Sequence, residues 1–161
     1  MRPAVAADER ALRRIDHETW SWLSSPAPPP PGNRTFFYDR TPPQDVLVAV
    51  VDGEVAGYAK LVKPMPYPSG EHVIRINGLA VAPEYQRRGA GRALLAAAVD
   101  EARRRGARKL TLGVFGSNDG ARRLYESFGF IVEGVQREHF FLDGRYVDDI
   151  LMAYDLSSDG Q

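Results

Sequence analysis

The chain has 161 residues, of which 43% are hydrophobic and 26% charged, the composition of a globular protein long enough to bury a core. Lysine plus arginine and aspartate plus glutamate number 21 each, so the totals give no sign of a nucleic-acid partner or a polybasic membrane tail. Cysteine is absent, which excludes disulfides, thiolate metal sites and a cysteine nucleophile. No apolar run is long enough to cross a bilayer, and the N-terminus reaches acidic residues too early for a signal peptide. We expect a cytoplasmic protein with a single domain over residues 1–156 and a frayed tail over residues 157–161.

Hydrophobic periodicity and turn signals predict one mixed α/β domain. In chain order, the expected elements are a helix over Asp8–Leu23, strands over Asp45–Val51, Val55–Val62 and His72–Val81, a helix from about Gly89 to Arg105, a strand over Lys109–Phe115, a helix over Asn118–Phe128, and strands over Phe130–Leu142 and Arg145–Leu156. Asp8 is a candidate N-cap for the first helix, and Trp22 is placed on its apolar stripe. Asp-Gly pairs at 52–53 and 143–144 predict two tight hairpins.

Two local features bear on a binding site. Pro26–Pro31 lies in a proline-rich segment that cannot be a helix or a central strand. It is either a surface connection or a semi-rigid wall over a cleft, beside the aromatic candidates Trp20, Trp22, Phe36, Phe37 and Tyr146. Gly78 interrupts a strand, which predicts a bulge or a close backbone approach.

The stretch Gly89-Ala90-Gly91 stands between a strand and a helix, an arrangement that suits an anion because N–H groups and the helix dipole point at it. A dinucleotide fingerprint would require Gly or Ala at the sixth position, which is Leu94, and a P-loop would require Gly-Lys-Ser/Thr. Both nucleotide readings fail on these residues.

The loop Gln86-Arg87-Arg88-Gly89-Ala90-Gly91 reads Q-x-x-G-x-G. The segment from Ser117 to Phe130 reads S-N-D-G-A-R-R-L-Y-E-S-F-G-F. Asn118, Ala121 and Tyr125 within it share one helical face, which is either a ligand-binding face or the ordinary core face of an amphipathic helix. Together, the two segments closely resemble the acetyl-CoA-binding loop and the N-x-x-A-x-x-x-Y block of the GCN5-related N-acetyltransferase (GNAT) family.

The resemblance covers nearly the whole chain and is sparse only between His17 and Asp45. It implies a mixed central sheet splayed at a strand bulge, acetyl-CoA as cosubstrate and a possible homodimer. We expect no metal and, from the composition, no nucleic-acid or membrane partner. The resemblance implies Tyr125 as the catalytic acid that protonates the departing thiolate. The cofactor-binding residues that it implies are Leu79, Ala80, Val81, Gln86, Arg87, Arg88, Gly89, Ala90, Gly91, Arg92, Asn118, Ala121 and Tyr125.

The general base departs from the family's pattern. Several related families carry a glutamate on a central strand, but the matching positions here hold Arg75, Asn77 and Gly113, which cannot accept a proton at neutral pH. The remaining candidates are Glu71, His72, Glu84, Asp148 and Asp149, each of which is more simply a solvated surface group, and His139 still more so.

Deprotonating a lysine-type amine at pH 7 costs about 4.6 kcal/mol, against about 1.4 kcal/mol for an α-amine. The sequence therefore favours acetyl transfer to an amino acid, a peptide N-terminus or another small amine, by direct attack in a ternary complex. The alternative is a non-catalytic acyl-CoA-binding sensor or regulatory module.

Overall fold

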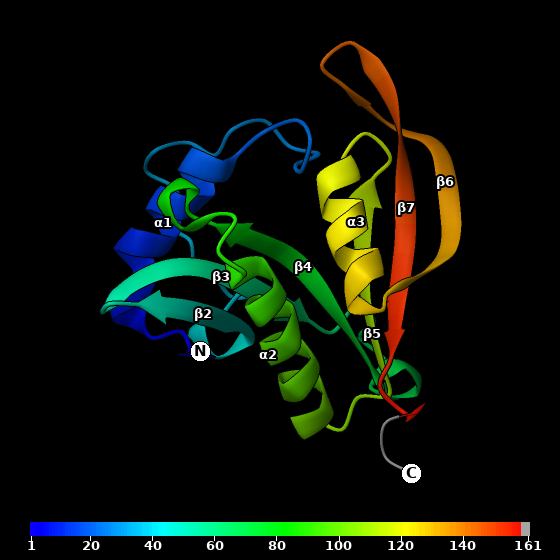
Figure 1. The fold of residues 1–161 in the computed structure, drawn as a ribbon, viewed down its shortest axis with the longest axis horizontal. Coiled ribbons are helices and arrows are strands. Elements are labelled where there is room, and N and C mark those ends of the chain that lie inside the picture. The colour runs from blue at the N-terminus through cyan, green and yellow to red at the C-terminus, as the bar shows by residue number, and fades with distance from the viewer. Residues whose placement is uncertain (159–161) are drawn as a thin grey trace.

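In the computed structural model, which describes residues 1–158, the chain folds around one seven-stranded mixed sheet with helices on both faces (Figure 1). The strand order is β1-β2-β3-β4-β5-β7-β6, and the β4–β5 pair is parallel while the other neighbouring pairs are antiparallel. The strands are β1 (Arg2–Pro3), β2 (Val46–Val51), β3 (Glu54–Val62), β4 (Val73–Val81), β5 (Lys109–Phe115), β6 (Ile131–Leu142) and β7 (Arg145–Asp155). The α-helices are α1 (Glu9–Thr19), α2 (Ala90–Arg104) and α3 (Asp119–Phe128). Residues 159–161 of the predicted tail lie outside the described residues.

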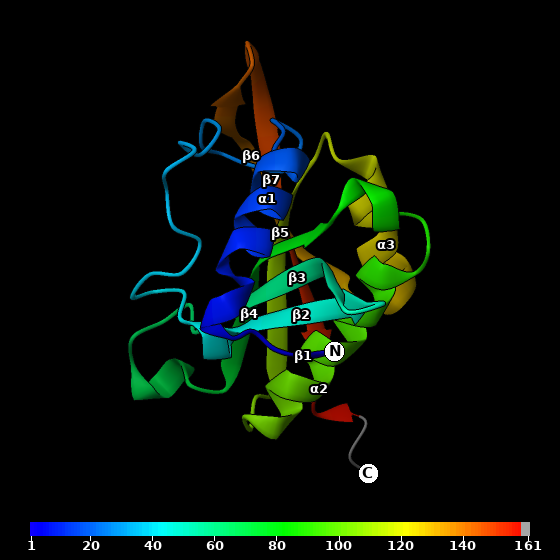
Figure 2. The same cartoon turned by 90° about the vertical axis from the view of Figure 1, so that its left-hand side faces the viewer.

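The helices divide the core into two layers. Helix α1 covers β3 and β4 on one face of the sheet, and α2 and α3 lie against the other (Figure 2). Leu12 and Ile15 of α1 are fully buried against β2 and β3, whereas Leu95 of α2 packs on Leu61 and Leu110. Each such side chain contributes about 1.5–3 kcal/mol of burial free energy. No helix within residues 1–158 has the length and apolarity needed to span a membrane.

Both predicted hairpins are present. Asp52 and Gly53 have φ angles of 50° and 80°, and Asp143 and Gly144 have 49° and 76°. Positive φ at both central residues matches the right-handed twist of the flanking strands, and Asp-Gly supplies it at low cost. These turns set the register of β2 with β3 and of β6 with β7.

The first helix is shorter than predicted. It ends at Thr19 rather than Leu23, where the Thr19 hydroxyl donates to the Ile15 carbonyl at 2.7 Å and Trp20 adopts extended backbone. Trp22 therefore leaves the predicted helical stripe and packs beside a separate cluster that contains Phe115. Asp8 stands at the N-cap but makes no side-chain cap; it forms an ion pair with Arg2 instead, at 2.8 Å.

The sheet opens between its two parallel strands. Strand β4 pairs with β5 only from Val73 to Arg75, after which the two strands diverge toward their carboxyl ends. On its other edge β4 carries one extra residue against β3, between Ile76 and Leu79, and Gly78 has a φ of +151°. The predicted mixed sheet, splayed at a bulge beside Gly78, is confirmed.

Candidate active site

Two cavities, of about 230 and 440 Å³, meet along the diverging half of β4. They share lining residues from the loop after α1 and from the bulge, and so they form one groove. The shared residues are Ser24, Pro26, Asn77, Gly78 and Leu79. The smaller cavity reaches between β4 and β5 toward α3, while the larger follows β4 to Gln86.

The loop before α2 has the geometry of an anion site. Gly89 at the N-cap has a φ of +82°, Arg87 has a φ of +60°, and no side chain caps the helix. The N–H groups of Ala90, Gly91 and Arg92 therefore have no intrahelical acceptor. They point out of the N-terminal end of α2, where the helix dipole is positive. These residues fit a pyrophosphate without any contribution from a side chain.

The side chains of this loop have separate environments. The Gln86 amide donates to the Val81 carbonyl at 2.9 Å and ties the loop to β4. Arg92 donates to the Ser127 hydroxyl at 3.4 Å, so its guanidinium is oriented toward α3. Arg87 is exposed, and Arg88 lines a hollow beside Val50 and Val51 of β2. A phosphate contact by any of the three arginines stays a prediction.

The backbone of β4 offers a second set of polar groups. Leu79, Ala80 and Val81 line the larger cavity just beyond the bulge. One edge of this segment is paired with β3, but β5 has already diverged from the other edge. Apart from the Val81 carbonyl, which accepts from Gln86, backbone groups on this free edge are available to the amides of an extended ligand such as pantetheine.

Helix α3 brings the three predicted side chains to the smaller cavity. Asn118, Ala121 and Tyr125 all line it, as their shared helical face requires. Asn118 is the N-cap: its Oδ1 accepts from the Ala121 N–H at 3.2 Å, and its Nδ2 donates to the Leu23 carbonyl at 3.1 Å. Burial raises the pKa of Tyr125, so the phenol is protonated throughout the neutral range.

The loop after α1 forms one wall of the groove. Pro26, Pro28 and Pro30 line the larger cavity, as the wall interpretation of the proline-rich segment requires. Of the five aromatic candidates, Trp20 and Phe36 also line it. Trp22 and Phe37 pack in buried clusters, and Tyr146 is 68% exposed on the last hairpin.

A polar cluster in the larger cavity was not predicted from the sequence. The Tyr58 hydroxyl donates to Asp16 Oδ1 at 2.7 Å, and the Lys60 ammonium lies 4.2 Å from the centre of the Phe36 ring. Burial lowers the pKa of Lys60. Tyr58 and Lys60 are two residues apart in β3 and therefore point to the same face of the sheet. Nothing in the sequence indicates that Asp16 of α1 lies opposite them.

The three positions that lack the expected glutamate lie together. Arg75, Asn77 and Gly113 all line the smaller cavity. Among the alternative bases, Asp149 of β7 lines it as well. Two others are engaged elsewhere: Glu84 pairs with Arg14 at 3.0 Å, and Asp148 accepts from the Glu138 N–H at 2.8 Å.

The sequence model described as the acetyltransferase (GNAT) family matches residues 10–130. The chain belongs to this family. It is 46% identical over 80 residues to the [ribosomal protein bS18]-alanine N-acetyltransferase of Escherichia coli K12, covering 49% of this chain and 53% of that protein. It is 31% identical over 111 residues to the L-amino acid N-acyltransferase MnaT of the same organism, covering 69% and 64%. The chain thus spans about half the length of the first of these curated relatives.

Solved structures of this GNAT protein's relatives share its fold. The smu.2055 protein of Streptococcus mutans UA159 superposes with a TM-score of 0.86 at 31% identity, covering 97% of this chain and 98% of that one. The yncA structure from Salmonella typhimurium contains acetyl-CoA as its cofactor and superposes with a TM-score of 0.66 at 30% identity, covering 72% and 66%.

Proposed function

We propose that this chain transfers an acetyl group from acetyl-CoA to an α-amine. The observation that carries the proposal is the smaller cavity, where the bulged backbone at Gly78 and the protonated phenol of Tyr125 converge between the separated strands. A thioester there has a polar backbone on one side and a proton donor on the other. This is the pairing that acyl transfer to an amine requires.

The groove suits the whole cosubstrate. The uncapped N-terminus of α2 suits its pyrophosphate, and the free edge of β4 suits the amides of pantetheine. With the sulfur beside Tyr125, the amine attacks the carbonyl carbon, the C–S bond breaks, and the phenol donates to the departing sulfur. Asn118 and Ala121 line the cavity on the side of α3, where the small side chain of Ala121 leaves room for the ligand.

Two observations support an α-amine as the acceptor. The relatives are named for acetylation of a ribosomal protein's alanine and for acylation of L-amino acids. The larger cavity also carries two cations, Arg34 and Lys60, against the single carboxylate of Asp16, and Lys60 forms no ion pair within the described chain. A carboxylate next to the reacting amine, as in a free amino acid, would provide their counter-charge.

The direct test measures release of the CoA thiol from acetyl-CoA with amino acids, their amides, N-terminal alanine peptides and polyamines as acceptors. Because the chain contains no cysteine, a thiol reagent detects product only. Tyr125→Phe should lower kcat by about 100-fold while the affinity for acetyl-CoA stays unchanged. Tight binding of acetyl-CoA with no acceleration by any amine would refute the proposal and favour an acyl-CoA sensor, the alternative that the absence of a glutamate at positions 75, 77 and 113 motivates.

A further inference from the structure

Position 113, one of the three positions that match the glutamate of related families, is approached by charged side chains from two neighbouring strands. A side chain built at Gly113 would begin 2.8 Å from Nη2 of Arg75 and 3.0 Å from Oδ1 of Asp149. Because real side chains essentially never approach a neighbour this closely, the two charged groups occupy the space that a residue at 113 would need. Both groups are the far ends of flexible side chains, so a larger residue at 113 would be accommodated only by displacing them.

The sheet register explains this placement. Asp149 of β7 is paired with Phe115, and Gly113 with Leu151, so Asp149 is the diagonal neighbour of Gly113 on the same face. This face is opposite the one that contributes Leu112 to the buried core. Tyr125, by contrast, packs against that core from α3 and enters the cavity from the other side of the sheet.

Within the described chain, the Asp149 carboxylate accepts no hydrogen bond and forms no ion pair, although it lies partly buried in the cavity. The ionisable side chains of this cavity are Arg75, Tyr125 and Asp149. Nearby, Asp148 is bonded to a backbone N–H, and His139 of β6 packs on the Phe140 ring. Among the ionisable side chains that line this cavity in the described chain, the carboxylate is thus the one whose oxygen lone pairs are free to accept a proton from the attacking amine.

Resting on the proposed acetyl transfer, we propose that Asp149 is its general base and replaces the glutamate absent at 113. As the amine nitrogen bonds to the thioester carbon, the nitrogen loses a proton to Asp149, directly or through one water. As the C–S bond breaks, the sulfur gains a proton from Tyr125. Solvent then returns Asp149 to its carboxylate and Tyr125 to its phenol, so the net products are the amide and the CoA thiol.

Asp149 and Tyr125 reach the opening between β4 and β5 from opposite faces of the sheet, which suits their separate roles as base and acid. The attacking amine and the leaving sulfur lie on different sides of the carbonyl carbon, so acid and base must approach from different directions. Arg75 Nη2 and Asp149 Oδ1 lie 2.8 and 3.0 Å from the position that a Cβ at 113 would take, so a cation stands near the carboxylate without forming an ion pair with it.

The test compares Asp149→Asn with Asp148→Asn, an isosteric control one residue away. D149N should lower kcat by about 100-fold with the acetyl-CoA affinity unchanged, and D148N should stay within about threefold of wild type. The loss in D149N should shrink for weakly basic amines such as hydroxylamine, whose adduct loses its proton to water readily. The D149N rate should also continue to rise at alkaline pH, where hydroxide replaces the base.

A second variant separates catalysis from structure. In Asp149→Ala, added formate should restore part of the rate, and it should have no effect on Asp148→Ala. Wild-type kcat in D149N, equal losses in both asparagine variants, or a weakened affinity for acetyl-CoA in D149N would each overturn the assignment while leaving the proposed function intact. Absence of turnover in the wild-type protein with every amine would instead overturn the proposed function and this assignment together.

Discussion

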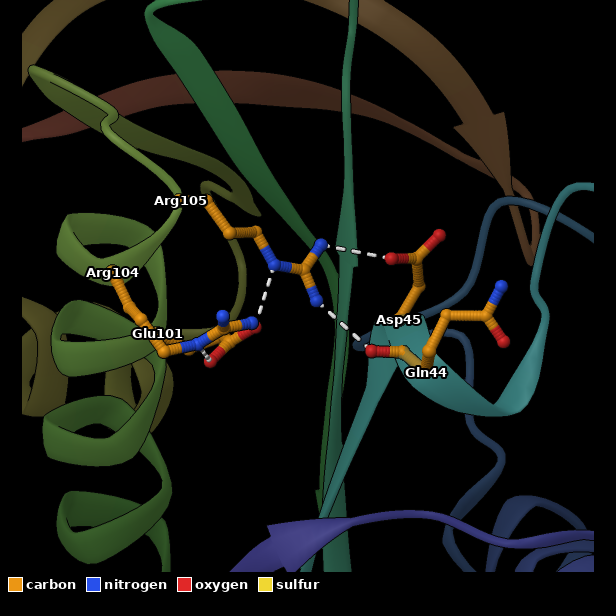
Figure 3. Close-up of polar contacts among 5 residues, drawn as sticks. All are labelled: Gln44, Asp45, Glu101, Arg104 and Arg105. Carbon is orange, nitrogen blue, oxygen red and sulfur yellow. Dashed lines mark hydrogen bonds and ion pairs between the residues drawn. The ribbon is translucent and has the colours of Figure 1, made fainter.

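Glu101→Gln is expected to destabilise the fold at neutral pH through one ionic network. Glu101 lies in the last turn of α2, and its side chain is 13% exposed. It accepts from Arg104 Nη2 at 2.6 Å and from Arg105 Nε at 2.7 Å. Arg105 then donates to Asp45 Oδ1 at 2.8 Å and to the Gln44 carbonyl at 2.9 Å, which ties α2 to the segment leading into β2 (Figure 3).

Hydrogen bonds from Arg104, followed by those from Arg105, lower the pKa of Glu101 from 4.5 to about 2. At 1.36 kcal/mol per unit, this difference corresponds to an upper value of about 3.4 kcal/mol. Solvent screens the pair with Arg104, which is 71% exposed, so we expect a loss of about 1–2 kcal/mol in E101Q. Because the folded pKa lies below the unfolded one, the stabilisation is complete above pH 4.5 and is lost as the pH falls toward 2.

Urea unfolding of the wild type and E101Q at pH 7 and pH 3.5 measures both quantities. The stability gap between them should narrow by about 40% at the lower pH, because the unfolded glutamate is mostly protonated there while the folded one is not. Glu126→Gln is the matched control, since Glu126 pairs with Arg122 on the exposed face of α3. It should cost less than about 0.5 kcal/mol. A gap independent of pH, or an equal loss in E126Q, would refute the reasoning.

Two further predictions concern the groove. Gly89→Val forces a β-branched residue to a φ of +82° at the mouth of the anion site, and calorimetry should show at least about tenfold weaker acetyl-CoA binding. Gly106→Val imposes a similar strain at φ +80° beyond the opposite end of α2; if it weakened binding as much, the effect would not belong to the loop. Tyr58→Phe leaves the Asp16 carboxylate without its 2.7 Å donor and should cost about 1.5–3 kcal/mol in thermal unfolding; an unchanged melting temperature would show that the bond contributes nothing.

The fold was predictable where the signals are local. Asp-Gly turns, apolar alternation and the helical stripe of α2 place the elements within one or two residues of their observed ends. The end of α1 was mispredicted because Trp22 continues the apolar period by chance and is buried by partners far away in the chain. The two-residue strand β1 carries no periodic signal at all, since it exists only through its pairing with β2.

The same distinction holds at the groove. The position of Gly89 at the start of α2 and that of Tyr125 on the cavity-facing side of α3 were predicted from motif spacing within a single element. The Asp16–Tyr58 hydrogen bond joins residues 42 positions apart, and nothing in either local pattern indicates the other. The assembly of such a cluster depends on which face of β3 meets α1, a property of the packed sheet.

The proposed general base, Asp149, shows that a catalytic group absent from one strand can be supplied by the neighbouring strand. A glutamate at 113 and a carboxylate at 149 would compete for one volume and repel each other, so each arrangement disfavours the other. The sequence of β5 alone therefore suggests that the general base is missing. The register of β5 with β7 instead places a carboxylate, Asp149, diagonally across from Gly113. Gly113 and Asp149 are therefore best considered together, because the absence of a side chain at 113 leaves room for the carboxylate of 149. Gly113→Glu in the wild-type background should accordingly displace Arg75 and Asp149 and lower the melting temperature. Combining it with Asp149→Ala should recover part of that loss, because only the contact with Arg75 then remains.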